Sequence, residues 1–224
     1  MTYFDFWIFT ILMLLSTYLG VVSNASMVIL YNIGSAVYAV GLGFGQAVCT
    51  LVGNNVGRGR ILKAKGYVAI GMILMQVINM GFSLVFLFAT DSVIGIYTSE
   101  PETIDCARST LRLIAFGHMI ESVQILFQGT IRGIGVQGRA FWANSLNYVV
   151  GVPLAIFFVF MLEPSNPLSG LFGLWLALYI AQTGIGVYYS ILLRDASWRP
   201  LEKPTLKTPL LLALIEFLIP YYTI

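Results

Sequence analysis

The chain has 224 residues and a net charge of +2; 58% of its residues are hydrophobic and only 10% are charged. A soluble globular domain carries about 25% charged residues, so this composition is that of a membrane protein. The small net charge gives no sign of a nucleic-acid-binding surface. The unit to count is therefore the membrane-spanning helix, which needs about 20 mostly apolar residues.

Apolar stretches long enough to cross a membrane occur six times along the chain. Hydropathy read over windows of about 19 residues predicts spanning helices at residues 4–22, 28–52, 67–89, 111–130, 143–162 and 171–193. A further apolar stretch, residues 209–224, is interrupted by Glu216 and Pro220 and is either an interfacial helix or a truncated span. The predicted fold is an all-α polytopic membrane bundle, with a six-helix lobe at 1–194 and a cytoplasmic tail at 195–224.

Basic residues fall on alternating sides of the predicted bundle. They lie between the second and third spans, between the fourth and fifth, and after the sixth: Arg58, Arg60, Lys63, Lys65, Arg132, Arg139, Arg194, Arg199, Lys203 and Lys207. The other connections contain Arg108 and are otherwise neutral or acidic. The positive-inside rule then predicts a multi-pass protein of the plasma membrane or an organelle membrane, with both termini in the cytoplasm.

One face of the fourth predicted span is polar. At about 100° per residue, His118, Glu121, Gln124, Gln128 and Arg132 project within an arc of roughly 120°. A charged side chain at the centre of a spanning helix costs about 2.5–3.5 kcal/mol, whereas an interhelical hydrogen bond contributes about 0.6 kcal/mol on average. Structural bonding alone does not offset that cost, so the stripe predicts a hydrated path with Glu121 as its ionisable group. For His118 alone, a packed core donor is an equally good interpretation.

Two glycine-rich stretches do not indicate nucleotide binding. Gly133, Gly135 and Gly138 match the spacing G-x-G-x-x-G, but that motif requires a preceding strand within a βαβ unit, and here it joins two spans. The stretch GRGRILKAKG lacks the order of a Walker A motif. No enzymatic activity is therefore expected, and a transporter built from this chain would be driven by an ion gradient.

Three stretches resemble motifs of the multidrug and toxic compound extrusion (MATE) transporters. GLGFGQAVCTLVGNNVGRGRILKAK resembles the family's V-G-N-x-x-G-x-G element; QGTIRGIGVQGRAFWANSLNYVVGVP is similar to G-x-x-R-G-x-G-x-Q followed by Y-x-V-G-x-P; GLFGLW is similar to G-x-x-G-L-W. The resemblance covers roughly residues 1–194, in the motif order of the C-terminal half of the twelve-helix family members. It implies one lobe of a transporter, which would work with a missing N-terminal lobe or with a second copy of itself.

The resemblance also implies site residues. The family's cation site in this half uses acidic residues on two helices, and these fall on Glu121 and Asp5. From the sequence alone, Asp5 is an ordinary interfacial acid, favoured by the helix N-terminus. Thr10 and Asn32 stand where family members often carry further acids. The predicted cavity lining consists of Tyr38, His118, Gln124, Gln128, Asn32 and Thr10.

The function implied is part of a secondary active exporter of small organic, often cationic, compounds, working as an antiporter by alternating access. H⁺ or Na⁺ would be the coupling ion, with no other cofactor and no bound metal; the partners would be the substrate, the lipid bilayer and another lobe. A truncated half-transporter without transport activity of its own is the alternative. A flippase for lipid-linked oligosaccharides is disfavoured, because the predicted cavity is not strongly basic.

Overall fold

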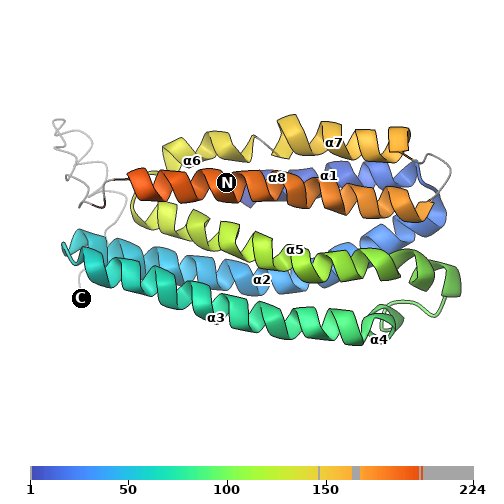
Figure 1. Ribbon diagram of the computed structural model, residues 1–224, viewed down its shortest axis with the longest axis horizontal. Coiled ribbons are helices and arrows are strands. Elements are labelled where there is room, and N and C mark those ends of the chain that lie inside the picture. Colours follow the sequence, from blue (N-terminus) through green and yellow to red (C-terminus); the bar gives the residue numbers. More distant parts are fainter. Residues whose placement is uncertain (1, 146, 163–166, 197, 199–224) are drawn as a thin grey trace, which may run out of the picture.

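The computed structural model describes the backbone of residues 2–145, 147–162, 167–196 and 198, and the side chains of 7–145, 148–160, 170–196 and 198. The regular elements in this part of the chain are all helical (Figure 1). In chain order they are α1 (Thr2–Thr17), α2 (Val21–Gly57), α3 (Ile61–Phe88), α4 (Thr90–Gly95), α5 (Pro101–Gly133), α6 (Gln137–Asn144), the π-helical η1 (Asn147–Gly151), α7 (Val152–Phe157), the π-helical η2 (Phe158–Leu162) and α8 (Pro167–Asp195).

Five helical stretches of the described residues are long and apolar enough to cross a membrane: Val21–Gly57, Ile61–Phe88, Pro101–Gly133, Gln137–Phe160 and Gly170–Asp195. They confirm the predicted all-α membrane bundle. The first predicted span differs, because α1 ends at Thr17 instead of residue 22. Gly20 separates α1 from α2 with a φ of 99°, a left-handed conformation that glycine adopts without steric cost. The apolar stretch 209–224 lies outside the described residues.

Helix α5 forms the centre of the bundle and contacts α2, α3 and α8 (Figure 1). Of its most apolar stretch 61% is buried, against 28% for α3. Three α3 side chains donate hydrogen bonds to carbonyls of α5: Ser83 to Ala115, Asn79 to His118 at 3.3 Å, and Gln76 to Met119 at 3.1 Å. Polar side chains that bond across helices hold a membrane bundle together, so α3 is attached to α5 alongside the polar stripe.

Helices α2 and α5 approach each other closely through glycines. A Cβ atom at Gly129 would overlap the carbonyl group of Gly45, and one at Gly133 would lie 2.7 Å from the Cys49 carbonyl oxygen. Small residues let two backbones come this near in a membrane, where packing replaces the hydrophobic effect as the main attraction between helices. This contact fixes the position of α5, and with it the polar stripe.

Two glycines from the stretches that resemble nucleotide-binding motifs lie at helix C-termini. Gly59 and Gly135 have φ values of 71° and 79° directly after α2 and α5. In each case the N–H of the glycine and of the following residue bond back to the last helical turn: Gly59 to Val56 and Arg60 to Asn55, then Gly135 to Arg132 and Val136 to Ile131. This is the Schellman arrangement of a helix C-terminus, so these glycines have a structural role.

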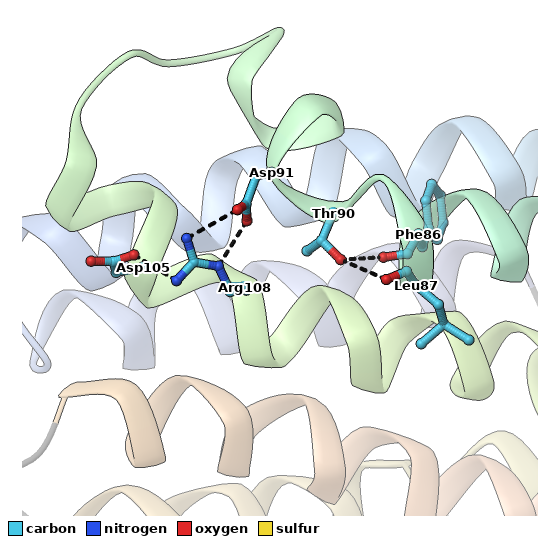
Figure 2. A network of polar contacts seen from close by, with 6 residues as sticks. All are labelled: Phe86, Leu87, Thr90, Asp91, Asp105 and Arg108. Atoms are coloured by element: carbon cyan, nitrogen blue, oxygen red, sulfur yellow. Dashed lines mark hydrogen bonds and ion pairs between the residues drawn. The ribbon is translucent and has the colours of Figure 1, made fainter.

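The two ends of the bundle differ in charge. One end, called here the basic end, contains the α2–α3 connection, the start of α6 and the end of α8 (Figure 1), with Arg58, Arg60, Lys63, Lys65, Arg139 and Arg194. At the opposite end, Arg108 of α5 donates from Nε to Asp91 of α4 at 2.7 Å and pairs with Asp105 at 2.7 Å (Figure 2). This hydrogen bond from Arg108 lowers the pKa of the Asp91 carboxyl. The ion pair between Asp91 and Arg108 attaches α4, which the sequence did not predict, to α5.

Candidate functional site

A pocket lies between α1, α2, α5 and α8, beside the middle of α5. Its cavity volume is about 20 Å³, which is room for about one water molecule, and it is partly open to the outside. Four aromatic residues and two ionisable residues define its lining: Phe9, Tyr31, Tyr38, Trp175, His118 and Glu121. Gly34 and Ser35 of α2 complete it. A Cβ at Gly34 would lie 3.5 Å from Trp175 and 3.7 Å from the His118 ring, so the glycine leaves room at the level of the histidine.

His118 and Glu121 form a buried pair. They stand three residues apart on α5, a spacing that places two side chains on one helix face. His118 Nδ1 lies 2.8 Å from Glu121 Oε2, and each residue is only 4% exposed. When Glu121 is ionised, Nδ1–H donates to Oε2, and this bond leaves the rest of the carboxylate beside the pocket.

Several buried polar atoms around this pair have no hydrogen-bond partner within the described residues. They are His118 Nε2, Trp175 Nε1 and Tyr179 Oη. A buried polar atom without a partner costs about 1–3 kcal/mol. The site therefore presents free hydrogen-bonding capacity beside the carboxylate, which a molecule or ion entering the pocket can use.

The pocket wall is aromatic. The ring of Phe9 lies 5.3 Å from that of Tyr31 and 5.7 Å from that of Trp175, and Trp175 lies 6.0 Å from Tyr179, between ring centroids. Aromatic faces attract cations, most strongly those of tryptophan, and the attraction grows when water is excluded. The aromatic faces and the carboxylate of Glu121 therefore both favour a positive charge in this pocket.

Three predicted site residues come together in this pocket: Glu121, His118 and Tyr38. Asn32 does not line it; this exposed residue donates from its amide to the Val28 carbonyl at 2.8 Å. Thr10 is exposed on α1 and is also outside the lining. The side chain of Asp5 lies outside the described residues.

The part of the polar stripe nearer the basic end does not line the pocket either. Gln124 and Gln128 are buried inside the bundle, one and two turns nearer the basic end. Gln124 Oε1, Gln128 Nε2 and Arg132 Nε have no partner in the part of the chain that the structure describes. The stripe is therefore interior, and two glutamines assigned to the cavity belong to the helix packing between Glu121 and the basic end.

Sequence reasoning missed the aromatic wall. Phe9, Tyr31 and Trp175 lie in apolar runs on three different helices, and the chain has 15 Phe, 12 Tyr and 4 Trp residues among which nothing distinguishes them. No sequence feature marked Gly34 and Ser35 as pocket residues either. Trp175 is the exception in part, because it closes the GLFGLW stretch used for the family resemblance.

A metal site is not formed among the described side chains, where no three His, Cys, Asp or Glu residues are grouped closely enough. An ion held in this pocket would rest on Glu121 and on neutral oxygen or nitrogen atoms around it.

Comparison with known proteins decides the family. A sequence model of the MatE family matches residues 2–157. The chain belongs to the MatE family. This confirms the family resemblance inferred from its motifs, and the family consists of transporters and not enzymes.

Relatives of the chain carry names that refer to extrusion. It is 28% identical over 195 residues to multidrug and toxin extrusion protein 1 of Oryctolagus cuniculus, covering 87% of this chain and 34% of that protein. Protein DETOXIFICATION 1 of Arabidopsis thaliana is 27% identical over 202 residues, covering 87% and 40%. The chain thus spans about a third of the length of the curated relatives it matches.

Solved structures share the fold. The crystal structure of a eukaryotic MATE transporter matches with a TM-score of 0.75 at 22% identity, over 86% of this chain and 43% of that one. An outward-facing multidrug resistance MATE family transporter of the MOP superfamily matches with a TM-score of 0.78 at 18% identity, over 96% and 47%. The bundle is therefore half of a MATE transporter fold, in a multi-pass integral membrane protein.

Proposed function

We propose that this chain is the C-terminal lobe of a cation-coupled exporter of organic cations, and that Glu121 is where H⁺ or Na⁺ exchanges with the substrate. The observation that carries the proposal is a buried carboxylate, paired with His118 at 2.8 Å, on the wall of a pocket that four aromatic residues line. Intramembrane ionisable residues most often mark a path for ions or substrates.

The pocket chemistry supports competition between two kinds of cation. The ionised Glu121 attracts an organic cation, and the faces of Trp175 and Tyr31 add a cation–π contribution. A proton or Na⁺ that neutralises Glu121 removes the charge on which the organic cation depends. The two ligands therefore oppose each other, and linkage makes the opposition reciprocal. Such opposition is what an antiporter requires.

Other residues take supporting roles. His118 holds the Glu121 carboxylate in place and supplies a second nitrogen to the pocket, and Tyr38 contributes a hydroxyl-bearing ring. Asp5, at the start of α1, would be the second acid of the site. The motif order supports the C-terminal half. An N-terminal lobe or a second copy would close the pocket and rock against it in alternating access, with the basic end in the cytoplasm.

Binding of radiolabelled tetraethylammonium to the purified chain in liposomes tests this proposal. We expect lower pH or added Na⁺ to displace the probe, and Glu121→Gln to weaken binding by at least about tenfold, or about 1.4 kcal/mol. The matched control is Glu102→Gln, an exposed glutamate on the same helix, which should leave binding unchanged. Probe binding that neither ion displaces would contradict the proposal.

The same liposomes distinguish this proposal from the alternative of a truncated half-transporter without transport activity. If ions displace the probe but the chain alone moves none of it across the bilayer, the lobe is competent and needs its partner. If the folded chain binds no probe at all, a truncated protein without transport activity is the better account.

A further inference from the structure

A second hollow lies at the basic end, between α6 and α8, away from the Glu121 pocket. It is an open groove of about 380 Å³ lined by Arg139, Trp142, Tyr188, Ile191, Leu192 and Asp195, called here the α6–α8 groove. The Tyr188 hydroxyl donates to the Arg139 carbonyl at 3.3 Å and joins the two helices beside it. The groove shares no lining residue with the Glu121 pocket.

The groove has two oppositely charged sides. Arg139 stands in the first turn of α6, and Asp195 is the last residue of α8. Both residues are exposed, and no ion pair joins either of them to another described residue.

Each charge has the same sign as the helix end on which it sits. The N-terminus of a helix carries a partial positive charge and the C-terminus a partial negative one. Arg139 adds to the positive field at the start of α6. At the end of α8, Asp195 adds to the negative field, and Arg194 in the last turn opposes it. An exposed cation and an exposed anion that line one groove favour a ligand with an anionic and a cationic group.

The surroundings place the groove at the membrane surface. It lies at the basic-end termini of two candidate spans, Gln137–Phe160 and Gly170–Asp195. Trp142 is 73% exposed and Ile191 is 54% exposed. Tryptophan and tyrosine concentrate where a spanning helix leaves the hydrocarbon core, at the level of the lipid head groups. Apolar side chains beside the two charges suit a molecule with a polar head and acyl chains.

We propose that the α6–α8 groove binds one zwitterionic aminophospholipid, of the phosphatidylethanolamine type. Its phosphate contacts Arg139 and the start of α6, its ammonium donates hydrogen bonds to Asp195, and its acyl chains follow Ile191 and Trp142. Phosphatidylglycerol has no cation for Asp195, and the quaternary ammonium of phosphatidylcholine has no N–H to donate. The presence of both Arg139 and Asp195 in one groove thus selects a head group that carries both a phosphate and an N–H donor.

Native mass spectrometry of the full chain, released from detergent with equal amounts of these three lipids, tests the proposal. We expect phosphatidylethanolamine to be retained in preference to the other two. Arg139→Ala should lower retention of both phosphatidylethanolamine and phosphatidylglycerol by about fivefold, since a basic residue at the membrane surface contributes about that factor to anionic head-group binding. Asp195→Asn should remove the preference for phosphatidylethanolamine while phosphatidylglycerol binding persists or rises.

Lys63→Ala is the matched control, because Lys63 is an exposed cation at the same end but outside the groove; the lipid preference should not change. A monodisperse profile in size-exclusion chromatography shows that each variant is folded. Equal retention of the three lipids by the natural chain, or a preference that survives Asp195→Asn, would overturn the proposal. Photoreactive phosphatidylethanolamine that labels only peptides other than those of α6 and α8 would overturn it as well.

Discussion

Helix α5 carries two acid–base pairs of the same spacing in opposite surroundings. Arg108 pairs with Asp105 three residues before it, at 2.7 Å, and His118 pairs with Glu121 three residues after it, at 2.8 Å. The side chains of the first pair are 37% and 64% exposed, and those of the second are 4% and 6% exposed. Distance and spacing are alike, so the pairs differ in their environment and in their base, because arginine is always charged and histidine is charged only when protonated.

The difference in burial determines how strongly each pair depends on its surroundings. Exposed ion pairs contribute about 0–1 kcal/mol, because water and salt screen them. A buried pair loses its hydration, and removing one partner leaves an uncompensated polar group or charge. We therefore expect ions and ligands in the pocket to affect the pair at His118 and Glu121 more than the exposed cluster at Arg108, which attaches α4 (Figure 2).

His118→Ala should produce the largest loss of stability. It removes the partner that holds Glu121 and leaves the carboxylate buried beside the pocket, a change that costs about 3–5 kcal/mol in buried pairs. Thermal unfolding in detergent, followed by size-exclusion chromatography, measures it. A melting temperature equal to that of the unchanged chain would mean that the buried pair contributes no more to stability than the exposed pair.

Gly129→Ala sharpens the comparison by testing what keeps the buried pair in place. The added methyl group meets the Gly45 carbonyl of α2, and overpacking of this kind costs about 1–3 kcal/mol. The matched control is Gly43→Ala on α2, where a Cβ meets nothing within 4 Å. That change should be neutral or stabilising by up to about 1 kcal/mol, from helix propensity. Equal effects of the two substitutions would contradict a backbone contact between α2 and α5.

Asp91→Asn should have the smallest effect. The hydrogen bond from Arg108 lowers the Asp91 pKa below its usual value of 3.8, so its contribution to stability is complete above that value and disappears as the pH falls through the folded-state pKa. Unfolding midpoints at neutral pH should shift slightly if at all, and the two proteins should converge at acid pH. A large shift at neutral pH would show that the exposed cluster is more than an attachment of α4.

Much of the bundle was predictable because a bilayer imposes a minimum helix length. Long apolar runs gave α2, α3, α5 and α8. The break at Gly20 and the short helix α4 were missed, since neither changes the hydropathy over a window the length of a span. The caps at Gly59 and Gly135 were recognised only as motifs that do not bind nucleotides.

The site was predictable only in its polar part. Glu121 could be found because an acid in a spanning helix is costly and therefore rare. Trp175 and Phe9 could not, because aromatic residues are ordinary in any membrane helix and only the fold shows which ones meet. Gln124 and Gln128 share a helix face with Glu121, yet periodicity cannot tell whether a face looks onto a pocket or onto another helix.

Infrared difference spectroscopy of the chain in liposomes tests most directly whether Glu121 exchanges an ion for an organic cation. At a pH where part of the protein carries a protonated buried carboxyl group, adding tetraethylammonium should remove that carbonyl band and produce the carboxylate bands. Glu121→Gln should abolish the signal, and Glu102→Gln should leave it intact. A probe that binds without changing the carboxyl band, or a signal that persists in Glu121→Gln, would contradict the central claim.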